Sequence, residues 1–252
     1  MTVLKDLNSK QRTKRTKVRK KDLAICIDLG TSLIKVSYLI DRLSIGYLEI
    51  APEYTKLPAQ SARRLPGKSK HGLPQNTAWL RYGKDEECHL IGNLAIEHRG
   101  FVAKKTLKWQ MATPKILSAI AIVLEREQLN PTSVKLSVVG ILLPKEEIAA
   151  RSQLTAQIVD RIKTSFYWRE EKIKVAIAPG AVCIAPEISG LVLDDLERDR
   201  DIADEVRLYL MGGKKHWSID TYINGTYSEI NSGCKDLGMF NLDRLMEQKI
   251  PG

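Results

Sequence analysis

The sequence predicts an α/β protein in which mixed sheets are flanked by helices. Apolar residues over 23–50 fall into three short runs separated by turn residues, a pattern typical of strands. Residues 114–127 and 146–167 instead repeat apolar side chains at helical spacing. Strand-like runs return after each helical stretch. Between two late runs, Asn224-Gly225 favours a two-residue hairpin turn, because both turn positions require positive φ.

The composition is that of an ordinary globular chain. Its 252 residues are 43% hydrophobic and 28% charged, enough to bury one large domain or two small ones. No apolar run approaches the roughly 18 residues of a membrane span, and the N-terminus lacks the apolar segment of a secretory signal, so we expect a cytoplasmic protein. The dispersed cysteines and histidines show no metal-ligand spacing or disulfide pattern.

The positive charge is concentrated in a tail. Residues 1–21 carry nine Lys or Arg residues against Asp6, which accounts for eight of the ten net positive charges. We expect this tail to be disordered in isolation and to bind nucleic-acid phosphates without sequence preference, or an anionic membrane surface; a merely solubilising arm is the alternative. The candidate nucleic-acid contacts are Arg12, Lys14, Arg15, Lys17, Arg19, Lys20 and Lys21.

The most specific local signal lies between the first two expected strands. There, Asp28 is followed by Gly30, Thr31 and Ser32, and Lys35 lies in the second strand. Glycine lacks a Cβ and tolerates positive φ, so the backbone can approach a ligand and its amides can cradle phosphate. Asp28 could hold a hydrated divalent cation, and Lys35 could neutralise phosphate charge. Alternatively, this is an ordinary hairpin in which Asp28 and Thr31 satisfy turn backbone groups.

The rest of the chain adds further expected elements. Residues 58–75 are rich in Pro, Lys, Arg, Ser and Gly, which predicts an exposed, mobile loop. An acidic stretch over 194–205 predicts a linker or solvated helix face, and 181–191 a small-residue helix or turn. Further strands are expected at 77–82, 88–91, 134–142, 173–178, 206–211, 217–223 and 226–230, and a last helix at 241–248.

Four motifs in this order resemble the actin-like ATPase superfamily, most closely the plasmid-segregation actins of the ParM/StbA type. The resemblance covers about residues 23–248. Asp28 to Lys35 is similar to the family's first phosphate motif, and 211–213 falls where its second would lie. Residues 91–95 resemble the segment before the first long helix, and 138–144 a strand–helix junction.

The resemblance implies an actin-like fold of two RNase H-like domains with ATP and Mg²⁺ in the cleft between them. The implied division is a basic tail (1–21), a first domain (22–185) and an incomplete second domain (186–252). The implied metal ligand is Asp28, and the implied phosphate contacts are Gly30, Thr31, Ser32, Lys35, Gly212 and Gly213. Self-association into filaments is implied as well, with an adaptor protein linking the filament to DNA.

The chain departs from the family pattern in the second motif. Leu210 stands where the family has an aspartate, and Lys215 and His216 stand where it has paired threonines. The family also carries a Glu or Gln that orients water after the strand that we assign to 173–178, and here Pro179-Gly180 follows. Phosphoryl transfer depends on positioned charge, so we expect weakened hydrolysis and name no catalytic residue.

Two functions of different classes follow. The first is an actin-like nucleotide-binding segregation protein of ATPase ancestry. The second is a catalytically inert pseudo-ATPase that binds DNA or filaments through its basic tail. A sugar kinase or a chaperone ATPase is disfavoured, because the chain lacks the acidic substrate motif of the first and the substrate-binding domain of the second.

Overall fold

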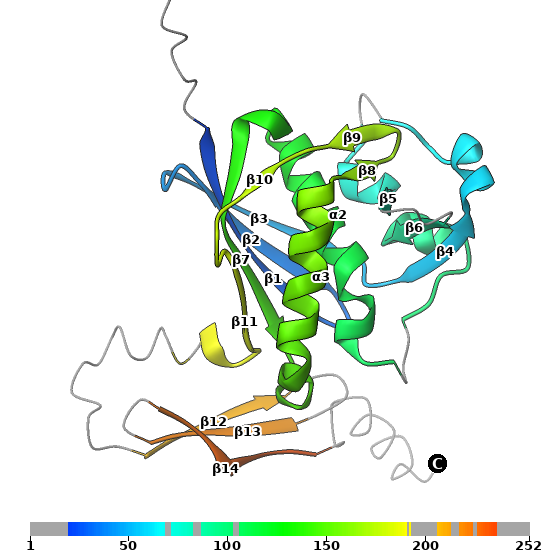
Figure 1. The fold of residues 1–252 in the computed structure, drawn as a ribbon. Coiled ribbons are helices and arrows are strands. Elements are labelled where there is room, and N and C mark those ends of the chain that lie inside the picture. Colours follow the sequence, from blue (N-terminus) through cyan, green and yellow to red (C-terminus); the bar gives the residue numbers. More distant parts are fainter. Residues whose placement is uncertain are drawn as a thin grey trace, which may run out of the picture.

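The computed structural model describes residues 20–68, 72–82, 87–102, 106–190, 192, 206–212, 217–223 and 226–235. Its described part contains three sheets and the helices α1 to α3, and residues 189, 190 and 192 are helical as well (Figure 1). The helices are α1 (Asn93–Glu97), α2 (Ala112–Arg126) and α3 (Arg151–Thr164). Short 3₁₀ turns occupy Ala59–Arg64, Pro74–Thr77, Lys108–Met111, Pro131–Ser133 and Lys145–Ala150.

The largest sheet has six strands and a mixed topology. It contains β1 (Lys21–Leu29), β2 (Ile34–Ile40), β3 (Ser44–Ile50), β7 (Val134–Leu143), β10 (Ala176–Ile177) and β11 (Val182–Pro186). The order is β10-β7-β1-β2-β3, and β11 also pairs with β7. Strands β1, β10 and β11 run parallel to β7, whereas β2 and β3 form an antiparallel meander with β1. The predicted opening meander is confirmed.

Helices α2 and α3 cover one face of this sheet (Figure 1). Every residue of α2 from Ala112 to Leu124 is buried, because the helix lies between the sheet, α3 and the five-stranded sheet. Helix α3 buries only the stripe of Leu154, Ile158 and Ile162, as its amphipathic pattern predicts. One face of the six-stranded sheet therefore forms the main apolar core, and polar positions such as Asp28 alternate with the buried ones.

A second sheet of five strands is built largely from the segment between β3 and α2. Its order is β4-β6-β5-β8-β9, with bounds Tyr54–Pro58, Glu87–Ile91, Trp79–Tyr82, Phe166–Trp168 and Glu171–Ile173. One prediction is incomplete here and another is wrong. The expected loop over 58–75 is largely exposed where it is described, but it contains 3₁₀ turns, and Ala62 and Leu65 are buried against this sheet. The helix expected to reach residue 167 ends at Thr164, because Ser165 takes a φ of 69° and β8 follows.

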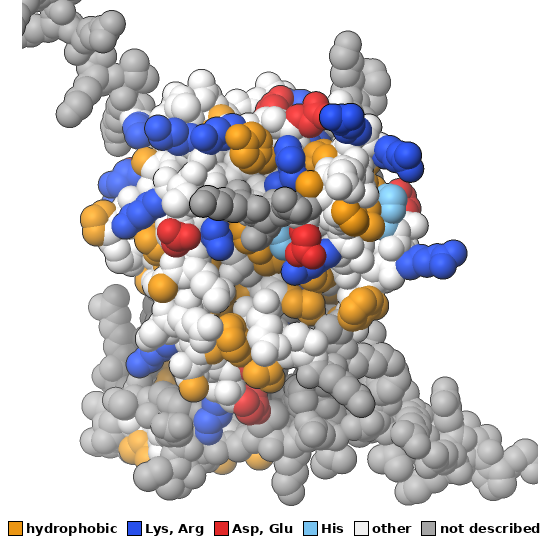
Figure 2. Space-filling model, turned by 45° about the vertical axis from the view of Figure 1, so that its right-hand side comes forward, with side chains coloured by type: hydrophobic (Ala, Val, Ile, Leu, Met, Phe, Trp, Pro, Cys, Tyr) orange, Lys and Arg blue, Asp and Glu red, His pale blue; other side chains and the backbone are white. Residues whose placement is uncertain are grey.

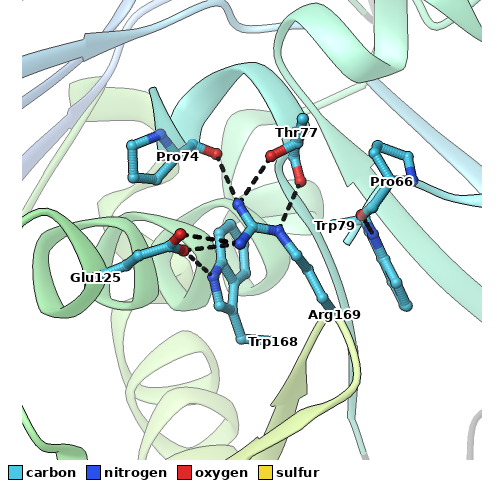
Figure 3. A network of polar contacts seen from close by, with 7 residues as sticks. All are labelled: Pro66, Pro74, Thr77, Trp79, Glu125, Trp168 and Arg169. Atoms are coloured by element: carbon cyan, nitrogen blue, oxygen red, sulfur yellow. Dashed lines mark hydrogen bonds and ion pairs between the residues drawn. The ribbon is translucent and has the colours of Figure 1, made fainter. Parts of the chain in front are cut away.

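A network around Arg169 ties this sheet to the carboxyl end of α2 (Figure 3). The guanidinium forms an ion pair with Glu125 at 2.9 Å and also donates to the carbonyls of Pro74 and Thr77 and to the Thr77 hydroxyl. The indole of Trp168 donates to the same Glu125 carboxylate. Since both charged side chains are almost fully buried, this network is a structural anchor.

The third sheet is an antiparallel meander of β12 (Val206–Gly212), β13 (Trp217–Ile223) and β14 (Thr226–Lys235). Ile223 lies opposite Thr226, which confirms the predicted hairpin. Tyr209 and Tyr222 pack against Ile188 and Val192, just beyond β11. The expected linker at 194–205, the helix at 241–248 and tail residues 1–19 lie outside the described residues.

Candidate functional site

The turn after β1 brings together the residues that the sequence singles out. Asp28 is half-buried and lies directly opposite Lys35 across the β1–β2 pair. Thr31 is half-buried and Ser32 is exposed at the tip of the turn. Gly30 does not use the tolerance of glycine for positive φ, because its φ is not positive. Glycine is required there by space, because a Cβ would lie 2.2 Å from the carbonyl oxygen of Leu33.

The structure corrects the position of the last parallel strand. The predicted strand at 173–178 is reduced to the two residues of β10, and β11 fills the main edge position beside β7. The residue after β11 is Glu187, whose backbone N–H donates to the carbonyl of Leu143 at 3.0 Å. An acidic side chain therefore does follow the last strand, and Gly180 is not the residue at this position.

Glu187 lies close enough to Asp28 for the two carboxylates to interact electrostatically. Burial raises the pKa of the Asp28 carboxyl, and the negative charge of Glu187 raises it further, whereas Lys108 and Lys35 lower it. Lys108 and Glu187 form an ion pair in which both side chains are mostly buried. Two carboxylates and two ammonium groups thus meet near the carboxyl ends of β1 and β11, the edge at which open α/β sheets bind ligands.

Sequence reasoning missed Glu187 and Lys108. Glu187 directly follows Val182–Pro186, whose small residues and proline favoured a helix or turn over the strand that the structure contains. Reading the strand eight residues too early placed Gly180 at that position. No local pattern marked Lys108, because only the fold brings it to Glu187 from a sequence separation of 79 residues.

The second phosphate motif is described only in part. Gly212 is the last residue of β12 and lies opposite Trp217, and Gly213 lies outside the described residues. Of the candidate tail contacts, only Lys20 and Lys21 are described, and both are exposed. On the face in Figure 2, Lys and Arg side chains are interspersed with acidic and apolar ones.

The site contains the oxygen ligands that Mg²⁺ prefers. Mg²⁺ usually takes one or two protein carboxylates together with water and substrate phosphates, and the half-buried carboxylate of Asp28 can supply one such ligand. The described residues contain no cluster of three or more His, Cys, Asp or Glu side chains suited to a metal. The residues present therefore fit a metal–phosphate complex better than an all-protein metal cage.

Comparison with solved structures places the fold. The filament structure of AlfA from the Bacillus subtilis plasmid pLS32 superposes with a TM-score of 0.60 at 13% identity, covering 90% of this chain and 78% of AlfA. Bacillus thuringiensis ParM with ATP gives 0.59 at 15%, covering 90% and 65%. The archaeal actin homologue Ta0583 gives 0.58 at 12%, covering 91% and 69%. No protein-family model and no curated protein matches the chain.

The chain therefore has the actin-like fold, and the predicted fold class is confirmed. In this chain the six-stranded sheet combines the antiparallel meander of β1, β2 and β3 with β7, β10 and β11, which run parallel to β1. Within the described residues, no helix has both the length and the apolar character needed to cross a membrane.

Proposed function

We propose that this chain is an actin-like nucleotide-binding protein of the plasmid-segregation type. The observation that carries the proposal is the arrangement of Asp28 and Glu187 beside a phosphate-type turn, at the carboxyl ends of the parallel strands. The actin-like fold and the ATP complex of one structural neighbour support the choice of nucleotide. The division into a first domain (22–185) and a second domain (186–252) is part of this proposal.

Each residue has a definite role in the proposal. Asp28 would bind Mg²⁺, which supplies positive charge against the phosphates. The amides and hydroxyls at Gly30, Thr31 and Ser32 would donate to phosphate oxygens, Lys35 would neutralise phosphate charge, and Gly212 and Gly213 would add amides from the proposed second domain.

Glu187 would accept a hydrogen bond from the attacking water and orient it. Such a group contributes about a hundredfold or more to a rate. The presence of Glu187 favours retained hydrolysis over the inert alternative. Leu210 still replaces an acidic residue, so we propose slow turnover.

Filament assembly is the second part of the proposal. The structure of AlfA is that of a filament, and this chain resembles it in fold. A nucleotide-dependent filament would link to DNA through an adaptor or through the basic tail, in the cytoplasm. Binding of DNA by the tail predicts a log–log salt slope of about −0.9 per phosphate contacted, and deletion of residues 1–19 should abolish it.

Calorimetry with Mg-ATP on the full chain tests the nucleotide site. We expect saturable binding, at least tenfold weaker in Asp28→Ala and unchanged in the control Asp160→Ala, which alters an exposed carboxylate on α3. Nucleotide-dependent pelleting tests assembly on the same samples. Equal binding by Asp28→Ala and the control would refute the assignment of the turn after β1.

A further inference from the structure

The carboxyl ends of three neighbouring parallel strands each carry an acidic residue. Asp28 is the next-to-last residue of β1, Glu187 directly follows β11, and Glu147 lies in the 3₁₀ turn after β7. Since β7 lies between β1 and β11 and the three strands are parallel, the three carboxylates lie at the same end of the six-stranded sheet, where the carboxyl ends of these strands meet. Such an end concentrates negative charge and needs cations or donors to stabilise it.

Residues 106–111, which we call the strap, contact two of these acids immediately before α2 begins. The backbone N–H of Trp109 donates to Oε2 of Glu147 at 2.8 Å, and Glu147 is only 8% exposed. The ammonium of Lys108 pairs with Oε1 of Glu187, and these two side chains are 20% and 26% exposed. The strap is thereby fixed at both contacts, and the Lys108 side chain has a defined direction.

Lys108 also acts on the third acid. Its positive charge stabilises the ionised form of Asp28, whereas Glu187 destabilises it. Lys108 is therefore a cation that interacts with both Asp28 and Glu187. Within the described part of the chain, the hydrogen bond from Lys108 involves only Oε1 of Glu187, and no partner is assigned to Oε2.

We propose that Lys108 is a positioning residue that orients Glu187 for the reaction at the proposed nucleotide site. The ion pair at Oε1 restrains the Glu187 side chain and leaves Oε2 to accept a hydrogen bond from water. The inference deepens the proposed function and rests on it. Lys108 itself transfers no proton and forms no bond to the substrate in this role.

The role predicts a particular pattern of kinetic effects. Removing the ammonium in Lys108→Met leaves Glu187 present but misdirected, so kcat falls by about tenfold to a hundredfold while KM changes less than about twofold. Lys108→Arg keeps a cationic donor and recovers most of kcat. Because Lys108 orients the attacking water through Glu187, the double variant Lys108→Met/Glu187→Gln at saturating Mg-ATP is no slower than Glu187→Gln alone.

The test measures phosphate release from Mg-ATP by the full chain and these variants. Lys56→Met is the matched control, since Lys56 forms an exposed ion pair with Glu87 in the five-stranded sheet. Urea unfolding of the same proteins without nucleotide supplies a second readout. There, the midpoint shifts of the two single variants should not add in the double variant, because both remove the same ion pair.

The possible results separate the two proposals. Additive losses in kcat, or a rise in KM alone for Lys108→Met, would overturn the positioning role while turnover by the unchanged protein upheld the proposed function. Additive urea shifts would likewise overturn it, because the pair would not be coupled. Absence of both binding and turnover in the unchanged protein would overturn the two proposals together.

Discussion

The two ends of helix α2 hold charged side chains in opposite ways. At its carboxyl end, Glu125 accepts from Arg169 and Trp168, and the guanidinium also donates to Pro74 and Thr77 (Figure 3). At its amino end, Lys108 pairs with one carboxylate, that of Glu187, and its charge also acts on Asp28, whose pKa is raised. Lys115 is buried there, and burial lowers its pKa to about 8.

The two ends of α2 therefore have different roles, one structural and one in the proposed nucleotide site. A buried ion pair with every donor used is rigid and has no spare capacity for a ligand. Charges with incomplete partners cost stability, and such groups cluster where ligands bind. The contrast indicates that the carboxyl end of α2 holds the sheets together, whereas the amino end lies at the proposed nucleotide site.

Breaking the anchor should have the largest effect on stability. Arg169→Met leaves Glu125 buried without its cation, so we expect a loss of about 3–5 kcal/mol in the free energy of unfolding, measured in urea. The control Lys56→Met breaks an ion pair whose side chains are about half exposed, and should cost at most about 1 kcal/mol. Similar losses in the two variants would remove the distinction between anchor and surface pair.

Removing the buried ammonium at the amino end should stabilise the protein. Burial lowers the pKa of Lys115 to about 8, so Lys115→Met should raise the unfolding free energy at pH 7 by up to about 3 kcal/mol. Between about pH 8 and 10.5 the unfolded lysine binds more protons than the folded one, so wild-type stability should rise with pH there, and the variant should lack this rise.

Urea unfolding from pH 7 to 10.5 measures both effects. Lys163→Met, which alters an exposed lysine on α3, is the control and should follow the wild type. A destabilised Lys115→Met with an unchanged pH dependence would mean that the ammonium is stabilised in place.

Adding a methyl group at Gly30, in the turn after β1, should give the smallest change in stability. The Cβ of Gly30→Ala would lie 2.2 Å from the carbonyl oxygen of Leu33, so the turn must shift, at a cost of about 1–2 kcal/mol. Mg-ATP affinity by calorimetry should fall at least tenfold. Gly67→Ala, where nothing lies within 4 Å of the added Cβ, should change neither quantity. Unaltered affinity in Gly30→Ala would mean that this turn does not contact the nucleotide.

The sequence predicted the elements whose pattern is local. Helix α2 was expected at 114–127 and occupies Ala112–Arg126, because its buried side chains recur at helical spacing. The opening meander was predicted correctly because the apolar runs of its strands and the turn residues between them indicate the same strand boundaries. The phosphate-type turn was identified for the same reason, although Gly30 is required there by space and not by a positive φ.

Elements that depend on distant partners escaped prediction. Strand β11 contains small residues and a proline, so its local pattern favoured a helix or turn, and only pairing with β7 makes it a strand. Strand β8 carries aromatic residues that continued a helical pattern but pack in the five-stranded sheet. The site could not be predicted in full for the same reason. Glu187 and Lys108 are far apart in the sequence, and only the placement of β11 and the strap brings them into contact.

Hydrogen–deuterium exchange with and without Mg-ATP tests the central claim most directly. If the edge at the carboxyl ends of β1 and β11 binds the nucleotide, amides in 28–35 and 106–111 should exchange more slowly with Mg-ATP, and those around Arg169 should not change. Protection confined to other segments, or none at saturating Mg-ATP, would contradict the account.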